Sequence, residues 1–283
     1  MSISESLRTI VDLRGVGDLE KEMSAEDKAF LESGVTVENT FVRHRNVLLS
    51  EADFSPLYVD YYLHCKDQGI HHEPEFDQLF KELLAAFTLH CASRPQNEVI
   101  AWTIRFANPL CSAFFAGDTE RGTVAGRLFT SGIRPGGESE MYQEIKRPNK
   151  PLHRSYVDFK GQGAIAPVER FYAQSEQRPG RLFFPEGDVG VLATAHPDYD
   201  EGWFTTMSTD ILAGLSENEE SNLLETRRYR WFCGCSLEKI QEVLRPICEQ
   251  DPEQIFGNDP TATVNCPRCA AHYTVTKDDL NSL

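Results

Sequence analysis

The chain has 283 residues, a length that usually folds as one large domain or two modest ones. Hydrophobic residues make up 40% and charged residues 25%, so a core can form without disulfide bridges. The formal net charge of -16 repels phosphate backbones and argues against a nucleic-acid partner. We read no secretory signal and no membrane-spanning run in the sequence, and therefore expect a cytoplasmic protein with no membrane partner.

The predicted elements, taken in chain order, indicate a mixed core. Residues 1–36 are polar and acid-rich, and we expect a weakly packed N-terminal extension there. From Glu75 to Ser93 apolar residues recur at spacings of three and four, which predicts a helix that Pro95 stops. Strands are expected at 99–106, 112–115, 123–130, 156–159, 181–185 and 189–195. An irregular loop between strands is expected over 131–153, and a helix is expected to start near Pro167. We therefore assign residues 37–203 to an α+β core domain.

Two further segments follow the core. Residues 204–232 are rich in charge, and we expect a partly helical connector. Residues 233–283 form a compact tail, a small domain of a helix plus a β-hairpin. Its elements are expected as a helix capped by Ser236 and ending near Pro246, a helical turn at 252–256, a hairpin from Thr261 to Val275, and a last helical turn capped by Thr276.

Four of the eight cysteines form two doublets, Cys233-Gly-Cys235 and Cys266-Pro-Arg-Cys269, with 30 residues between them. Four thiolates complete a tetrahedral zinc site, and paired doublets in a reducing cytosol more often bind metal than pack as small hydrophobic residues. The sulfurs of a C-x-C doublet are also close enough to oxidise to each other, and oxidised pairs cannot bind zinc. We therefore predict one zinc ion per chain in the reduced state, bound by Cys233, Cys235, Cys266 and Cys269.

This doublet pattern, followed by His272-Tyr273, resembles the zinc domain of the heat-shock protein 33 family, and the segment Phe171 to Gly190 is similar to part of that family's core. The likeness extends from about residue 75 to the end of the chain. It implies zinc on the four cysteines and oxidation to the disulfides Cys233–Cys235 and Cys266–Cys269. It also implies a redox-regulated chaperone of the stress response, without enzymatic activity or catalytic residues, that holds unfolding or oxidatively damaged client proteins without ATP. A homodimer is an option in the oxidised state.

Three features depart from the family pattern. Ala270 follows the second doublet where a glycine is expected, so we predict a strained turn at that position. The connector is shorter than in typical members of the family, and this difference affects the unfolding of the connector that the resemblance implies on activation. Residues 1–36 have no counterpart that we can align.

Other cysteines and histidines invite a functional interpretation. His64-Cys65 and His90-Cys91 look like nucleophile–base pairs, but adjacent residues on a helix point about 100° apart, so we expect core packing. Cys248 is expected to pack on the apolar side of its helix. His272 is either an outer-sphere partner of the metal or a plain strand residue, and its match to the family favours the first.

Two competing functions remain. One is a zinc-ribbon interaction module that contacts RNA or the translation machinery, and the acidic segment 249–260 argues against it. The other is a thiol oxidoreductase, which needs a C-x-x-C at a helix N-terminus, whereas Cys266 is expected in a hairpin.

Overall fold

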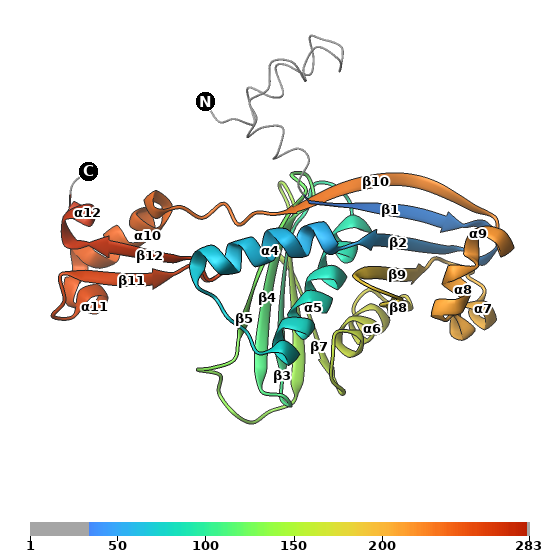
Figure 1. The fold of residues 1–283 in the computed structure, drawn as a ribbon, viewed down its shortest axis with the longest axis horizontal. Coiled ribbons are helices and arrows are strands. Elements are labelled where there is room, and N and C mark those ends of the chain that lie inside the picture. Colours follow the sequence, from blue (N-terminus) through green and yellow to red (C-terminus); the bar gives the residue numbers. More distant parts are fainter. Residues whose placement is uncertain (1–33, 282–283) are drawn as a thin grey trace, which may run out of the picture. The chain divides into compact units, whose positions relative to one another are not determined.

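The computed structural model describes residues 34–281, and the elements below all lie in one compact unit of the chain, Val35–Leu283. Within this range ten strands form one large sheet, with the order β7-β6-β3-β4-β5-β10-β1-β2-β9-β8 (Figure 1). The strands are β1 (Val35–Val42), β2 (Val47–Asp53), β3 (Val99–Phe106), β4 (Cys111–Asp118), β5 (Thr123–Phe129), β6 (Ser139–Lys146), β7 (His153–Phe159), β8 (Gly180–Phe183), β9 (Val189–Ala195) and β10 (Ser221–Trp231). Among residues 34–281, no helix is both long enough and apolar enough to cross a membrane.

The helices of the core are α4 (Ser55–Gln68), α5 (Pro74–Ala92), α6 (Ile165–Gln174), α7 (Glu201–Thr206), α8 (Thr209–Ala213) and α9 (Leu215–Asn218), with a 3-10 turn η1 (Arg43–Arg45) between β1 and β2. The tail consists of α10 (Leu237–Gln250), α11 (Pro252–Phe256), the hairpin β11 (Thr261–Asn265) and β12 (His272–Thr276), and α12 (Lys277–Asn281). The α+β class, with a mixed core and a small tail of helices plus a hairpin, is confirmed.

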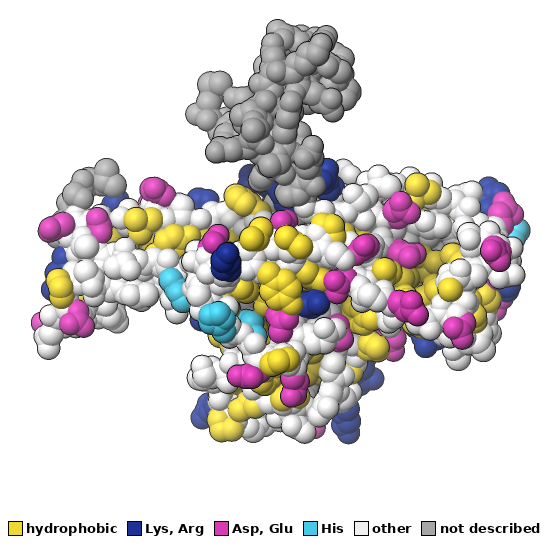
Figure 2. Space-filling model, in the orientation of Figure 1, with side chains coloured by type: hydrophobic (Ala, Val, Ile, Leu, Met, Phe, Trp, Pro, Cys, Tyr) yellow, Lys and Arg dark blue, Asp and Glu magenta, His cyan; other side chains and the backbone are white. Residues whose placement is uncertain are grey.

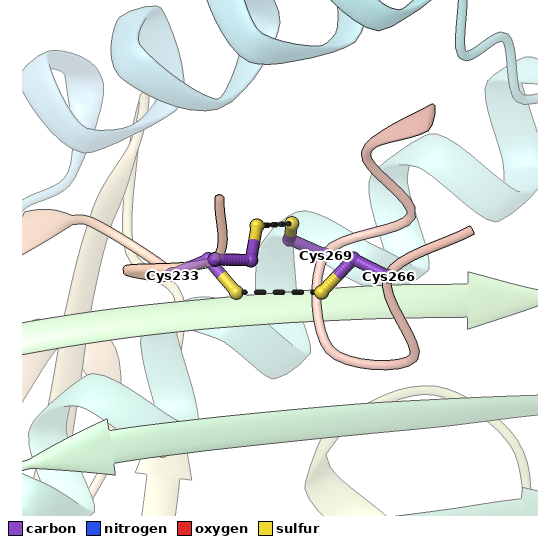
Figure 3. A group of neighbouring side chains, drawn as sticks. Cys233, Cys266 and Cys269 are labelled. Atoms are coloured by element: carbon purple, nitrogen blue, oxygen red, sulfur yellow. Dashed lines mark hydrogen bonds between the residues drawn. The ribbon is translucent and has the colours of Figure 1, made fainter. Parts of the chain in front are cut away.

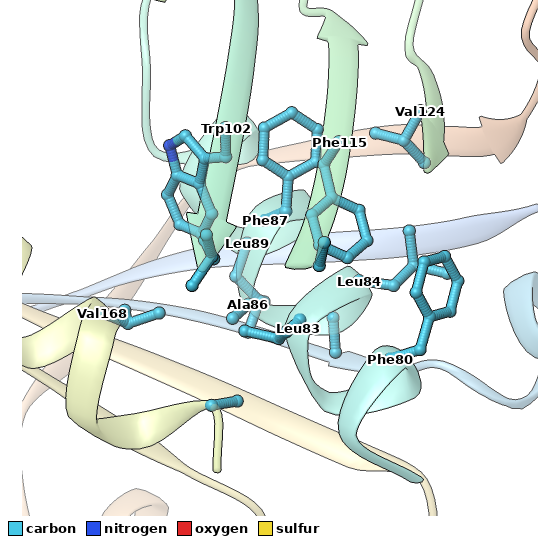
Figure 4. Close-up of a cluster of buried hydrophobic side chains, with 14 of the residues drawn as sticks. Phe80, Leu83, Leu84, Ala86, Phe87, Leu89, Trp102, Phe115, Val124 and Val168 are labelled. Carbon is cyan, nitrogen blue, oxygen red and sulfur yellow. The ribbon is translucent and has the colours of Figure 1, made fainter. Parts of the chain in front are cut away.

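The core forms where α5 packs on the sheet. Pro74 occupies the first turn of α5, where its missing N–H costs nothing, and the helix then buries its apolar face. Phe87 is fully buried, with its ring centroid 5.2 Å from that of Trp102 and 5.6 Å from that of Phe115 (Figure 4). Each such side chain contributes roughly 1.5–3 kcal/mol by leaving water, so we expect this contact layer to keep the core folded without a metal.

The sheet consists of two halves that β10 joins. Strand β10 runs antiparallel to β1 from Val35↔Tyr229 to Val42↔Ser221, with a bulge near Asn39. On its other side it pairs parallel with β5, at Arg230↔Thr123 and Trp231↔Val124. The last residue of β10 therefore lies where both halves of the sheet meet, two residues before the first cysteine of the tail.

The connector over 204–232 is partly helical, as expected, through α8 and α9, but its second half, residues 221–231, forms the unexpected strand β10, which pairs with β1. Two further expectations need correction. The expected loop over 131–153 contains β6, in which Met141, Gln143 and Ile145 alternate inward between proline- and glycine-rich flanks. The helix expected to end near Pro246 runs on to Gln250, since the buried Cys248 fixes its last turn.

The expected extension of residues 1–36 falls mostly outside the described residues. Its last two residues, Val35 and Thr36, belong to β1, and Val35 is buried in the core.

Candidate metal centre

The four predicted cysteines come together in the structure. Their sulfur atoms all lie within 4.8 Å of one another. Among residues 34–281, these four side chains are the group of cysteine, histidine or acidic residues placed closely enough to hold a metal ion. The Cys233 and Cys266 sulfurs are 3.6 Å apart, and the Cys235 and Cys269 sulfurs are 3.5 Å apart (Figure 3). None of the four is joined in a disulfide.

The local backbone explains how each doublet presents its sulfurs. Cys266-Pro-Arg-Cys269 is the turn between β11 and β12, closed by hydrogen bonds from Ala270 N to Cys266 O (3.0 Å) and from Cys266 N to Ala271 O (2.7 Å). We call this turn, Cys266–Ala271, the knuckle. Ala270 has a φ of 63°, a left-handed conformation that favours glycine, so the predicted strain at this position is confirmed.

The first doublet is placed between two regular elements. It follows β10 directly, and Gly234 between the two cysteines has a φ of 69°. Ser236 then caps α10 by accepting a hydrogen bond from the Lys239 backbone N–H, as expected. The cap and the glycine turn together fix the direction of both sulfurs.

The sulfur spacing fits a tetrahedral metal site. With metal–sulfur bonds of about 2.3 Å, the edges of a sulfur tetrahedron are about 3.8 Å long, close to the two distances above. A disulfide would need sulfurs about 2.05 Å apart. Four soft sulfur donors without an open position are typical of structural zinc sites, so the residues present fit zinc.

The electrostatics of the cluster also favour a cation. The Cys266 sulfur accepts hydrogen bonds from the thiols of Cys233 and Cys269 and from nearby backbone N–H groups, which hold the pKa of Cys266 well below its usual range. Hydrogen bonding to Cys266 raises the pKa of Cys233 to about 12, and hydrogen bonds to Cys233 and Cys266 likewise raise the pKa of Cys269. Hydrogen bonding within the cluster thus favours the thiolate form of Cys266, and four thiolates together require a positive ion to offset their repulsion.

Of the pair His272-Tyr273, the tyrosine contacts the cluster. The Tyr273 hydroxyl donates to the Cys235 sulfur over 3.1 Å, whereas the His272 side chain is exposed. The expectation that His272 is the outer-sphere partner therefore needs correction: in a strand, neighbouring side chains point to opposite faces, and only one of the two can face the sulfurs.

The core itself contributes to the site. His64 on α4 lies 2.8 Å from the Cys269 carbonyl oxygen through its Nε2 atom, and Arg127 on β5 donates to the Cys266 carbonyl over 3.2 Å. Trp231 packs between the core and the cysteines, against the rings of Tyr61 and His64. Sequence reasoning missed His64, which the expectation of plain core packing had set aside.

Four of the other residues for which core packing was predicted, Cys65, His90, Cys91 and Cys248, pack as expected. His90 and Cys91 are fully buried on α5, with the His90 Nδ1 atom 2.8 Å from the Tyr172 hydroxyl, and Cys65 is buried on α4. Cys248 packs with apolar residues of the tail. These core-packing predictions are confirmed.

Charged side chains hold the start of the connector strand. Arg45 of η1 donates to Glu219 from Nε (3.0 Å) and Nη2 (2.8 Å), and its neighbour Arg43 contacts Glu220 over 2.6 Å. Hydrogen bonds from Arg43 and His44 lower the pKa of Glu220. The connector strand β10 is therefore anchored by ion pairs at its start and by Trp231 at its end.

Comparisons with known proteins agree with the motif. A family model described as "Hsp33 protein" matches residues 189–276. The chain is 22% identical over 251 residues to the 33 kDa chaperonin of Proteus mirabilis, covering 75% of this chain and 85% of that protein. It is also 22% identical over 237 residues to the 33 kDa chaperonin of Pectobacterium carotovorum, covering 72% and 82%. The solved structure of the heat shock protein 33 homolog from Thermotoga maritima has the same fold, with a TM-score of 0.65 at 15% identity, covering 88% of this chain and 96% of that one.

Proposed function

Because the chain resembles the heat-shock protein 33 family in motif, sequence and fold, we propose that it is a redox-regulated chaperone that holds unfolding proteins without ATP. The names of its relatives support the chaperone role. We place it in the cytoplasm, as a non-enzymatic protein whose partners are client proteins damaged by oxidants, with dimerisation in the oxidised state. The observation that carries the proposal is the packing of Trp231, the last residue of the connector strand, against the buried cluster that contains Cys266 and Cys269.

In the reduced state, Cys233, Cys235, Cys266 and Cys269 would bind one zinc ion. The metal supplies folding energy to a tail whose own apolar core is small. The residues of the chain orient the sulfurs through the knuckle, the Gly234 turn and the hydrogen bond from Tyr273.

Oxidation would end this state. Joining Cys233 to Cys235, or Cys266 to Cys269, removes two electrons from two thiolates and forms one sulfur–sulfur bond. With hypochlorous acid as the oxidant, the electrons reduce chlorine, which leaves as chloride, and the oxygen leaves as hydroxide. A disulfide carries no negative charge on sulfur, so the joined pairs no longer bind the ion.

Loss of the metal would destabilise the connector strand β10 through the packing of Trp231. This residue packs on the cysteine cluster and on the core, so disorder in the cluster removes one side of its contacts. Strand β10 pairs with β5 only at Arg230 and Trp231, and the rest of the strand depends on its pairing with β1 and on its polar anchors. The connector is therefore the part of the sheet that metal loss would weaken first.

Release of the connector would uncover apolar surface for clients. Leu223 and Leu224 on β10 are already 56% and 60% exposed. Phe204 and Met207, by contrast, are buried against the face of β2 and β9, so lifting this segment exposes both the side chains and the sheet beneath them. On the face drawn in Figure 2, hydrophobic side chains also gather over α4, where Val59 and Leu63 are exposed.

The test follows light scattering of a heat-unfolded model protein with the chain in three states: reduced with zinc, oxidised, and re-reduced with zinc. We expect suppression of aggregation to rise on oxidation and to fall again on re-reduction. Equal activity in all three states would reject redox gating, and inactivity in all three would favour the zinc-ribbon interaction module.

A further inference from the structure

Two hydrogen bonds connect the core directly to the backbone of the predicted metal ligands. The Cys269 carbonyl oxygen can only accept, so the His64 Nε2 atom 2.8 Å away donates to it. The Cys266 carbonyl accepts from Arg127 over 3.2 Å and also from the Ala270 N–H that closes the knuckle. Both acceptors belong to ligand residues themselves, so the core constrains the residues whose sulfurs the metal would hold.

A third contact extends the same surface along α4. Gln68, one helical turn after His64, accepts a hydrogen bond from the His272 backbone N–H over 2.7 Å. Beneath the polar contacts, Ala125 of β5 and Trp231 pack against the knuckle cysteines. In Figure 1 the end of β11 and the start of β12 lie beside α4 and β5, where these contacts are made.

The knuckle would otherwise have a weak hold on the core. Along the chain, Cys266 lies 31 positions beyond Cys235, across α10 and α11, so the covalent path from the connector strand does not position it. The turn also contains Ala270 in a left-handed conformation, which favours opening once the sulfurs are released. The hydrogen bonds from α4 and β5 are direct polar contacts between the core and this turn.

We propose that His64, Gln68 and Arg127 form a docking contact that holds the knuckle on the core and slows loss of the metal. This contact acts from α4 and β5, and so couples the metal centre to the core by a route that does not pass through β10. It rests on the proposed function, because it assumes zinc on the four cysteines. His64, Gln68 and Arg127 are positioning residues, since they act on the ligands through backbone atoms.

The test measures the rate of zinc transfer from the reduced, zinc-loaded full chain to a colour-forming chelator in excess, without oxidant. Removing one hydrogen bond to a ligand residue should speed transfer by about three- to tenfold in His64→Ala and in Arg127→Ala. His64→Gln keeps an N–H donor and should restore part of the slow rate. His71→Ala, which removes an exposed histidine just beyond α4, is the matched control and should leave the rate unchanged.

Hydrogen exchange provides a second measurement that needs no variant. Chelating zinc from the wild-type chain should speed exchange of the α4 amides from Leu63 to Gln68, while the β8–β9 pairs keep their protection. Wild-type transfer rates in both alanine variants, or unchanged α4 exchange after chelation, would overturn the docking contact and leave the proposed function standing. A reduced chain purified without zinc would instead contradict the proposed function.

Discussion

The core around α5 and the tail around the four cysteines bury their side chains on very different scales. Helix α5 alone buries twelve residues, among them Phe80 and Phe87. In the tail, α10 buries only Cys248, which packs with Phe256, Val275 and Leu280. Small domains with so little apolar burial usually need a metal or disulfides to stay folded. The same chain therefore contains one region that apolar packing stabilises and one for which we expect a metal on its thiols to supply the stability.

The largest expected effect is loss of the metal site. Cys266→Ser removes one of four ligands, and apparent zinc binding in small cysteine-rich domains is worth about 10–16 kcal/mol of folding free energy. We expect the variant to lose most of its zinc and residues 233–283 to become sensitive to protease, while the core stays resistant. Cys248→Ser, which changes a buried cysteine outside the cluster, should keep one zinc per chain. A metal-free Cys266→Ser variant with a resistant tail would contradict the dependence of the tail on zinc.

A substitution in the core should have the opposite effect: it should destabilise the core and leave the zinc content unchanged. Phe87→Ala leaves a cavity between Trp102 and Phe115 and should lower the free energy of unfolding of the core by about 3–5 kcal/mol. Denaturant unfolding measures this change, and the zinc content should stay that of the wild type. Val243→Ala, at a position 68% exposed on α10, should change stability by less than about 0.5 kcal/mol. Loss of zinc in Phe87→Ala would show that the two regions are not independent.

A smaller effect is expected where the connector lies on the core. Asn39 is buried at the bulge of β1, accepts from the Ser50 hydroxyl over 2.6 Å, and donates to Glu225 of β10 over 3.2 Å. Asn39→Ala leaves the Ser50 hydroxyl without this acceptor and should cost about 1–3 kcal/mol. Hydrogen exchange should become faster in β10 in particular, whereas Asn218→Ala, at an exposed residue, should leave β10 unchanged. Equal exchange of β10 in the two variants would reject a role for Asn39 in holding the connector.

The smallest effect is a dependence on acid. Arg43 and His44 lower the pKa of Glu220, and the Trp203 N–H and Arg45 lower the pKa of Asp200. A lowered carboxyl pKa contributes stability above the unfolded pKa of about 4, and this contribution is lost as pH falls through the folded pKa. We expect β10 to exchange faster as pH falls from about 5 to 3, after correction for the intrinsic rate. Arg43→Ala should flatten part of this dependence, and an identical pH profile in the variant would remove Glu220 from the explanation.

Local patterns in the sequence predicted much of the core and most of the candidate site. The apolar spacing from Glu75 to Ser93 predicted α5, and β3 and β9 have the predicted bounds. The two cysteine doublets predicted the four clustered sulfurs, because a ligand doublet is a local feature that spacing reveals. Ser236 and Thr276 also cap the helices that they were predicted to cap.

Tertiary structure decided the rest, because the partners lie far apart in the chain. Strand β10 has four charged residues in its second half, Glu225, Arg227, Arg228 and Arg230, and its sequence resembles a connector. It becomes a strand because its backbone pairs with β1, as in Val35↔Tyr229. His64 and Cys269 are 205 positions apart, and only the packing of α4 beside the knuckle brings them into contact. The sequence by itself determined which residues can bind a metal, since ligand type and spacing are local. Which residues of the core hold that site in place depends on long-range packing, which no local pattern records.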